Sequence, residues 1–374
     1  MKILSLEHEG YRNLSPGMVY PDAGINVICG YNAQGKTNLL EALWLFTGAH
    51  SFRGAKDGEL TAFSKDTGEK QAFSRLKLCF LSGGREQEAQ ITIRGGRRSL
   101  RLNGVDKRSC GALAGVFCAV IFSPEHLSLV KDGPANRRNF LDGALCQLRP
   151  AYVKTVNQYN RILLQRNALL KDIVRHRELI DTIDIWDERL ASFGAQIISE
   201  RLRYVEKLLP CAKNAYSGIS SGREVLDLVY RSGVSCADPS YEALRACLRE
   251  KLRASLKDDI RMGSTSCGPH RDDLDLLIGG ISARSFGSQG QQRSAVLALK
   301  LSEADLLGEA CGEEPVILLD DVLSELDESR QDYLLNHLKG RQVFITCCSP
   351  EHTRLLNRGK IFSILRGRVS QQTV

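Results

Sequence analysis

The chain has 374 residues, of which 43% are hydrophobic and 25% are charged, and its formal net charge is +7. This length is enough for about two or three domains with a sizeable core, and the composition excludes a disordered or fibrous chain. The modest positive charge permits nucleic acid as a partner without requiring it, and no apolar run approaches the length that spans a membrane.

The N-terminal residues 1–8 alternate apolar and polar side chains, which predicts a β-strand and lacks the apolar centre of a signal peptide. The 12 cysteines include no C-x-x-C pair, which argues against a zinc site or a thioredoxin-like motif. Cys29, Cys79 and Cys118 stand in apolar surroundings, as small buried thiols do in a reducing compartment. We therefore expect a cytoplasmic protein with no membrane partner.

A glycine-rich loop follows the predicted buried strand at residues 25–29. Residues 30–37 fit the phosphate-binding pattern G-x-x-x-x-G-K-[ST] at every fixed position, and residues 38–43 predict the helix that must follow. Bare N–H groups and the helix N-terminus then face the anion. We expect Lys36 to reach the β- and γ-phosphates in a catalytic role and Thr37 to hold Mg²⁺. The predicted nucleotide-binding residues of this loop are Gly30, Tyr31, Asn32, Ala33, Gln34, Gly35, Lys36, Thr37 and Asn38.

A basic hairpin region comes next. Residues 76–81 and 90–93 predict strands, and Gly95-Gly96 and Asn103-Gly104 are typical of hairpin turns. The cationic side chains of this region are Arg94, Arg97, Arg98, Arg101, Lys107 and Arg108. Two interpretations stay open, a solvated sheet edge whose charges oppose aggregation and a surface that contacts a phosphate backbone.

Residues 151–209 predict two helices. This segment contains no proline, and its apolar residues recur at spacings of three and four on either side of a polar break at residues 175–178. We expect two antiparallel helices that form an arm about 40 Å long. Their Lys-, Arg- and Glu-rich faces are most simply solvated faces.

Two further motifs lie in the C-terminal part. Residues 285–293 combine a serine, glycines and the start of a predicted helix, which makes a second anion site. One subunit does not need two such sites for one nucleotide, so we expect Ser288, Gly290 and Gln291 to bind the γ-phosphate held by a second subunit. The apolar strand at residues 315–319 ends in Asp320 and Asp321.

Asp320 is predicted to meet the Mg²⁺ held by Thr37, and Asp321 to orient or deprotonate the attacking water. By itself an Asp-Asp pair after a strand is also compatible with a turn or a helix cap. The phosphate loop favours the catalytic interpretation. Residues 342–346 predict another buried strand.

At this point the chain resembles ABC-type ATPases. Gly287-Ser288-Gln289-Gly290-Gln291 looks like their signature motif, and Ser324-Glu325-Leu326-Asp327 looks like their D-loop. In that superfamily two heads enclose two nucleotides, each completed by the signature loop of the partner. The implied fold class is an α/β, ABC-type phosphate-loop ATPase head with an inserted antiparallel helical-hairpin arm.

More narrowly, the chain resembles the RecF family of bacterial recombination-mediator ATPases. The segments that carry this resemblance span nearly the whole chain; they are residues 11–14, 35–42, 123–130, 137–142, 268–274, 287–293 and 319–322. The resemblance implies a cytoplasmic protein that binds ATP and DNA, dimerises with ATP and hydrolyses it slowly. It also implies action with RecR and RecO at single-strand gaps or junctions, in recombinase loading, replication, repair and the SOS response.

Several residues depart from the wider ABC pattern. Asp321 replaces the usual glutamate, and its shorter carboxylate predicts weak hydrolysis. Cys347 stands where a switch histidine is expected, and His352 lies too far along to take that role. The residue that takes the place of the Q-loop glutamine is left open between Glu125 and Gln147. Other open assignments are Arg12 and Asn13, as nucleotide contacts or a charged strand edge, and His270, as a coupling residue or the partner of a buried carbonyl.

These motifs predict three segments. Residues 1–135 form the N-terminal part of the head, residues 136–261 the helical arm, and residues 262–374 the C-terminal part of the head. The leading function is a DNA-dependent, dimeric ATPase clamp. The alternatives are the ATPase subunit of an ABC transporter, a nucleotide-gated binding protein with negligible turnover and, least favoured, a small-molecule kinase.

Overall fold

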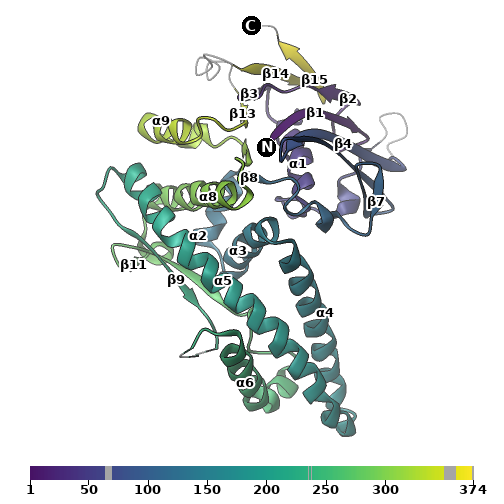
Figure 1. The fold of residues 1–374 in the computed structure, drawn as a ribbon, viewed down its shortest axis with the longest axis vertical. Helices are drawn as coiled ribbons and strands as arrows, with labels where there is room; N and C mark the ends of the chain where they lie inside the picture. The colour runs from purple at the N-terminus through teal and green to yellow at the C-terminus, as the bar shows by residue number, and fades with distance from the viewer. Residues whose placement is uncertain (64–69, 235, 237, 349–358, 373–374) are drawn as a thin grey trace. The chain divides into compact units, whose positions relative to one another are not determined.

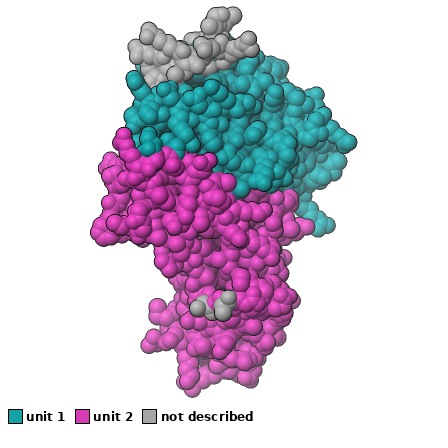
Figure 2. Space-filling model, turned by 60° about the vertical axis from the view of Figure 1, so that its left-hand side comes forward, with its two compact units in different colours: residues 1–127, 218–221, 297–374 teal, residues 128–217, 222–296 magenta. Residues whose placement is uncertain are grey.

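The structure is a computed structural model, which describes residues 1–63, 70–234, 236, 238–348 and 359–372 (Figure 1). It divides into two compact units, coloured separately in Figure 2. The first, here called the head unit, comprises residues 1–127, 218–221 and 297–374. The second, the arm unit, comprises residues 128–217 and 222–296. These units are defined by packing, and the three-segment division at residues 135 and 261 stays a prediction.

The head unit contains a six-stranded sheet in the order β15-β14-β3-β13-β12-β8. Five of its strands are parallel, and β15 is antiparallel at the edge. Strands β8, β12 and β13 are buried along their whole length, as expected for the continuous apolar runs of a parallel sheet. The strands are β3 (Ile25–Cys29), β8 (Ala119–Phe122), β12 (Val316–Leu319), β13 (Val343–Cys347), β14 (Lys360–Leu365) and β15 (Arg368–Gln372). The predicted strands at residues 25–29, 315–319 and 342–346 are thereby confirmed.

A second, antiparallel sheet of the head unit has the order β2-β1-β4-β5-β6-β7. Its strands are β1 (Lys2–Glu9), β2 (Gly17–Val19), β4 (Phe73–Ser82), β5 (Arg85–Arg94), β6 (Arg97–Leu102) and β7 (Val105–Lys107). Both residues of the Gly95-Gly96 and Asn103-Gly104 turns have positive φ, as do Gly83 and Gly84. Two positive φ angles in a two-residue loop match the right-handed twist of the strands, so the predicted hairpins are confirmed.

Among its described residues, the head unit contains the helices α1 (Lys36–Trp44) and α9 (Glu328–His337), together with most of α8 (Gln289–Cys311). Helix α1 is buried on nearly every face, which its three leucines, alanine and tryptophan allow. Short 3₁₀ helices connect the strands; they are η1 (Leu45–Thr47), η2 (Asp57–Glu59), η3 (Cys110–Leu113), η4 (Pro124–Leu127) and η6 (Leu323–Glu325).

The arm unit is mainly helical. Its described helices are α2 (Ser128–Lys131), α3 (Pro134–Leu148), α4 (Pro150–Ile173), η5 (Arg177–Thr182), most of α5 (Ile183–Ser220), α6 (Tyr241–Met262) and α7 (Ala283–Phe286). A small antiparallel sheet in the order β11-β10-β9 accompanies them. It consists of β9 (Leu226–Arg231), β10 (Asp273–Ile278) and β11 (Ile281–Ser282).

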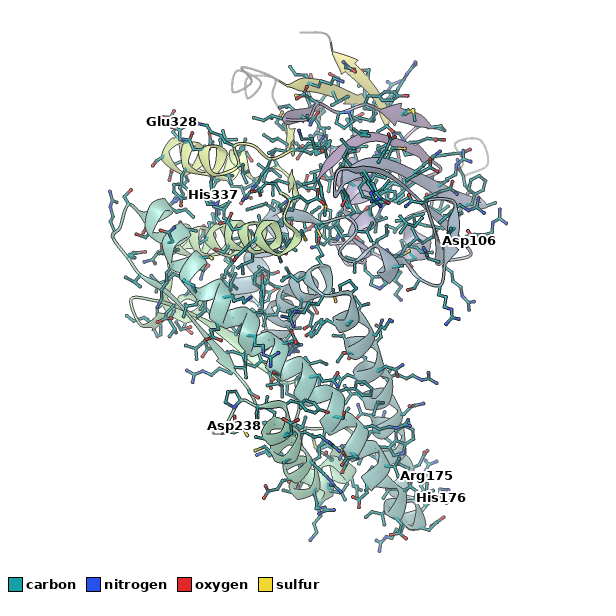
Figure 3. The ribbon with its side chains drawn as sticks, in the orientation of Figure 1. Asp106, Arg175, His176, Asp238, Glu328 and His337 are labelled. Carbon is teal, nitrogen blue, oxygen red and sulfur yellow. The ribbon has the colours of Figure 1, made fainter. Side chains whose placement is uncertain are left out.

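Helices α4 and α5 run antiparallel. Arg149 pairs with Glu200, Thr155 with Gln196, and Arg166 with Asp187, so the partner number falls as the α4 number rises. The 24 residues of α4 span about 36 Å, and Figure 3 shows Arg175 and His176 at the end of the arm where α4 stops. The predicted helical hairpin and its polar break are confirmed.

Helix α6 adds a third element to this hairpin, which the sequence did not predict. It contacts α4 through the Arg166–Asp259 ion pair and α5 through the Arg245–Glu188 ion pair. None of the helices in the described part of the chain is long and apolar enough to cross a bilayer.

Candidate nucleotide-binding site

The loop at residues 30–37 connects the end of β3 to the start of α1, in the context that the phosphate-binding pattern requires. Gly30 has φ 157°, and a Cβ placed there would lie 2.5 Å from the Ile364 carbonyl oxygen. Gly35 has φ 117°, and its Cβ would lie 2.7 Å from Asn13 Oδ1. Neither position accepts a side chain without strain, so the backbone of the loop can approach an anion closely. Ala33 also has a positive φ, of 62°.

The Asn13 side chain holds the loop from the outside. Its Nδ2 donates to the Ala33 carbonyl at 3.1 Å, and its Oδ1 accepts from Asn38 Nδ2 at 2.8 Å. The Gln34 side chain is also engaged, since its Oε1 accepts from the Arg366 amide at 2.5 Å. These bonds join the middle of the loop to the first turn of α1. The Asn13 contact is therefore with the protein's own loop.

Arg12 anchors the same segment to helix α1. Its Nε and Nη2 each donate to a Glu41 carboxylate oxygen at 2.8 Å, and Tyr11 and Ser51 donate to that carboxylate as well. Burial raises the pKa of Glu41, but hydrogen bonds from Arg12 and Ser51 outweigh it and leave the pKa lowered. The ionised, fully buried Glu41 thus links the segment that precedes Asn13 to the helix that follows the phosphate loop.

The Lys36 side chain lies against the backbone of this loop. Its Nζ donates to the carbonyls of Gly30 and Tyr31, the latter at 3.2 Å, and to Cys348 Sγ at 3.4 Å. The three acceptors are neutral groups, so a phosphate would offer this ammonium a stronger partner.

Thr37 and Asp320, the two predicted Mg²⁺ ligands, are hydrogen-bonded to each other. Thr37 Oγ1 donates to Asp320 Oδ1 at 3.0 Å, and Thr346 Oγ1 donates to the same oxygen at 2.9 Å. Burial raises the pKa of Asp320, and the two hydroxyls oppose that shift. A hydroxyl and a carboxylate are oxygen ligands suited to Mg²⁺, so these residues fit the predicted cation.

Thr346 is a site residue that the sequence did not reveal. Strand pairing of β12 with β13 ends at Leu319 and Ile345, which brings Asp320 and Thr346 together one position later. The Thr346 hydroxyl also accepts from the Asp321 amide at 2.8 Å. A hydroxyl that ends the strand neighbouring the acidic strand is the signal that could have identified it.

Asp321 lies in a tight turn. It has φ 53°, and Ser324 Oγ donates both to its carbonyl at 2.8 Å and to its Oδ1 at 3.1 Å. Ser324, the serine of the predicted D-loop, therefore orients the carboxylate that we assign to the attacking water. The Asp320-Asp321 pair and the D-loop thus form one local structure.

The signature residues belong to the arm unit, whereas the phosphate loop and Asp320 belong to the head unit. Ser288 and Gln291 form a capping box at the start of α8, where the Gln291 amide donates to Ser288 Oγ at 3.2 Å and the Ser288 amide to Gln291 Oε1 at 2.7 Å. Gln291 Nε2 also donates to Glu224 at 2.6 Å, and Gly290 lies in the first turn of the helix. Ser288 itself is exposed.

The structure separates the two Q-loop candidates. Glu125 lies in η4, directly after β8, the strand that pairs with β12. Burial raises the pKa of Glu125, and Asp320 contributes to this rise while Arg53 opposes it. Gln147 is buried on α3 in the arm unit. Glu125 is therefore the candidate that lies beside the acidic strand.

The two histidine assignments come out differently. His270 Nε2 donates to the Thr265 carbonyl at 3.1 Å, and its Nδ1 accepts from Tyr159 OH at 2.6 Å, so it satisfies a backbone carbonyl. Burial lowers its pKa to about 4. Cys347 ends β13 at the place of the expected switch histidine, and His352 lies outside the described residues.

Known proteins share this sequence and this architecture. The profile described as RecF/RecN/SMC N terminal domain matches residues 2–367. The "DNA replication and repair protein RecF" of Clostridium acetobutylicum is 39% identical over 99% of this chain and 100% of its own length. That of Caldanaerobacter subterraneus subsp. tengcongensis is 40% identical over 90% of this chain and 92% of its own.

Solved structures agree with these relatives. The "recombination mediator protein RecF-ATP in RecFOR pathway" has a TM-score of 0.92 and 37% identity, and the match covers 100% of this chain and 98% of that one. An Smc head domain from Pyrococcus furiosus, at 15% identity and a TM-score of 0.57, shares the fold. The predicted α/β ATPase head is thus confirmed, and the RecF family takes the place of the transporter alternative. The chain belongs to the RecF family, within the wider group of RecF, RecN and SMC N-terminal domains.

Proposed function

We propose that this protein binds ATP and Mg²⁺ at the residue 30–37 loop and uses the nucleotide to close a dimeric clamp on DNA. The observation that carries the proposal is the meeting of Thr37 and Asp320 beside a loop whose glycines admit no side chain. Bound Mg²⁺ would neutralise charge on the phosphate oxygens. Lys36 would exchange its backbone acceptors for the β- and γ-phosphates, and the bare N–H groups of Gly35 and its neighbours would donate to the remaining oxygens.

The nucleotide would join two copies of the chain through the signature loop. Ser288 Oγ accepts from Gln291, which leaves its own O–H free to donate to a phosphate oxygen. The capping box also holds the N-terminus of α8 in a shape that suits an anion. Ser288, Gly290 and Gln291 of one copy would thus complete the pocket that holds the γ-phosphate on the other.

Hydrolysis would open this clamp, and Asp321 is the residue assigned to the attacking water. Its short carboxylate is already engaged with Ser324, so we expect slow turnover of ATP. ATP turnover measured alone and with DNA tests this expectation. Fast turnover by the isolated protein would reject it.

The cellular role follows from the family. The relatives are named as DNA replication and repair proteins, and the solved RecF structure as a recombination mediator of the RecFOR pathway. We therefore propose that this protein acts in the cytoplasm with RecO and RecR at single-strand gaps or junctions. Recombinase loading, replication restart and SOS induction are the processes that it would support.

Sedimentation velocity with and without ATP tests the clamp. Wild-type protein is expected to shift from monomer to dimer when ATP and Mg²⁺ are added. Lys36→Met should lose ATP binding and the shift together, because the phosphates lose their cationic partner. Ser288→Arg should retain ATP binding but stay monomeric, because the new side chain fills the space for the partner's γ-phosphate.

Ser99→Arg is the matched control, since it places the same side chain at an exposed strand position outside both loops. It should dimerise like the wild type. Dimerisation of Ser288→Arg with ATP would contradict the role assigned to the signature loop. A wild-type protein that stays monomeric at saturating ATP would contradict the clamp as a whole.

A further inference from the structure

Two buried thiols face each other at the base of the phosphate loop. Cys29 is the last residue of β3, Cys347 is the last residue of β13, and the two are directly opposed in the parallel ladder. Their Sγ atoms are 3.2 Å apart, and both side chains pack in one apolar cluster with Val27. A disulfide has an S–S length of about 2.05 Å, so an approach of about 1 Å would join them.

The two thiols are chemically unequal. The Cys347 thiol donates a hydrogen bond that lowers the pKa of Cys29; burial raises that pKa, and the nearby Lys36 ammonium lowers it. The pKa of Cys347 is raised by its contact with Cys29 and by burial. Cys29 is therefore the thiol better suited to become a thiolate, the form of cysteine that attacks an oxidant.

Both cysteines are joined through their neighbours to the contacts of Lys36. Cys29 precedes Gly30, whose carbonyl accepts from Lys36 and whose tight approach to Ile364 leaves little room for movement. Cys347 precedes Cys348, whose sulfur accepts from Lys36 at 3.4 Å while its S–H donates to Asn32 at 3.0 Å. A movement of the sulfur pair thus displaces groups on both sides of the lysine.

We propose that Cys29 and Cys347 form a reversible disulfide when the protein meets a hydroperoxide, and that this bond weakens ATP binding at the adjacent loop. The inference rests on the proposed ATP site. It makes the protein a clamp that is disabled by oxidation and restored by thiol reductants.

The chemistry balances with the hydroperoxide as oxidant. The Cys29 thiolate attacks the peroxide oxygen, so that an S–O bond forms, the O–O bond breaks and the alcohol leaves with a proton. The Cys347 thiol then attacks the Cys29 sulfenic sulfur, so that the S–S bond forms, the S–O bond breaks and water leaves. Two thiols lose two electrons, and one hydroperoxide is reduced to an alcohol and water.

Two other thiol pairs supply internal controls. Cys118 and Cys311 have sulfur atoms 3.7 Å apart in the head unit, and Cys236 and Cys247 have sulfur atoms 2.8 Å apart in the arm unit. None of these four residues neighbours the phosphate loop in sequence. Oxidation at either pair should leave ATP binding unchanged.

The experiment compares ATP binding by the reduced full-length protein with binding after treatment with hydrogen peroxide. Equilibrium binding of a fluorescent ATP analogue provides the affinity, and mass spectrometry of peptides under non-reducing conditions identifies each disulfide. We expect a Cys29–Cys347 disulfide and binding weaker by about tenfold or more, since a misplacement of about 1 Å has large effects in such sites. Dithiothreitol should restore the affinity.

The variant Cys347→Ala should bind ATP like the reduced wild type and keep this affinity in peroxide. The double variant Cys236→Ser/Cys247→Ser should respond to peroxide like the wild type. Peptide mapping of the wild type keeps the test decisive if Cys347→Ala folds poorly.

Three results would overturn the proposal. They are oxidised protein without the Cys29–Cys347 disulfide, a disulfide that leaves the affinity unchanged, and peroxide sensitivity that persists in Cys347→Ala but disappears in Cys348→Ser. Absence of ATP binding by the reduced wild type would instead refute the proposed nucleotide site, so the two failures are distinguishable.

Discussion

Two buried ionisable side chains of the head unit show how burial acts on a single residue. The Glu41 carboxylate is fully buried yet ionised, because Arg12 donates two hydrogen bonds to it. His8 on β1 is 1% exposed, and neither of its ring nitrogens has a hydrogen-bond partner among the described residues. Burial lowers its pKa to about 4, against a small opposing effect of Glu7. A charge is retained in this interior only where a partner compensates it.

His8 predicts an acid-sensitive stability. Its pKa of about 4 in the folded state is below the unfolded value near 6.5, so the unfolded chain binds the proton first. The stabilisation is complete above pH 6.5 and is lost as the pH falls toward 4. Between pH 7 and pH 5 the wild type should lose about 2 kcal/mol more unfolding free energy than His8→Leu. Urea unfolding at the two pH values measures this, and equal losses in both proteins would contradict it.

At the scale of elements, the arm is held together by a buried ionic cluster. Arg166 on α4 is fully buried and donates to Asp187 on α5, to Asp259 on α6 and to Thr265. A single guanidinium thus joins all three long helices. Burial raises the pKa of Asp187 even though Arg166 favours its charged form. Such a cluster specifies how the helices pair, and it is costly to break because both carboxylates are buried.

Arg166→Met should therefore destabilise the arm by about 3–5 kcal/mol, since two buried carboxylates lose their cation. Arg161→Met is the matched control, because Arg161 lies on the same helix and is exposed. Urea unfolding monitored by helical circular dichroism compares the two variants. Similar stability of Arg166→Met and Arg161→Met would show that the cluster does not hold the arm.

At the scale of the whole molecule, the proposed clamp needs a surface that contacts DNA. The basic residues of the hairpins fall into two groups, those engaged in contacts within the protein and those exposed to solvent. Arg98 donates to the Ala49 carbonyl at 2.6 Å and pairs with Asp57 at 2.9 Å, which is a structural role. The exposed cations of this region include Arg94, Arg97, Lys107 and Arg108. Arg97 and Lys107 lie on the neighbouring strands β6 and β7, and they are two of the exposed cations available for a phosphate backbone.

We expect Arg97→Ala/Lys107→Ala to weaken DNA binding uniformly across sequences. For this variant, the slope of log affinity against log salt should be less steep by about 2. The reason is that each lost phosphate contact removes about one released counterion. Arg175→Ala/Arg177→Ala removes the same charge from the end of the arm and serves as the control. Fluorescence anisotropy of gapped DNA across a salt series measures both. If the arm variant weakened DNA binding more than the hairpin variant, the hairpin surface would be contradicted and the arm would be the DNA-contacting surface.

Much of the fold could be predicted from the sequence, because the patterns that indicate it are local. The pattern of residues 30–37, the Asn103-Gly104 turn and the helical periodicity of residues 151–209 each report the conformation of one short segment. The acidic pair at residues 320–321 was assigned because a buried strand precedes it. These features determined the ATPase head, the arm and the nucleotide residues that the proposal uses.

Only the tertiary structure decided which distant residues meet. Thr37 and Asp320 are 283 positions apart, and strand order alone brings Thr346 to the same carboxylate and Cys347 to Cys29. The hydrogen bonds of Asn13 to the phosphate loop and the packing of α6 against the arm helices also join residues that are distant in the sequence. The physical reason is that spacing along a chain reports the periodicity of a single element, whereas the pairing of elements depends on how their buried faces pack together.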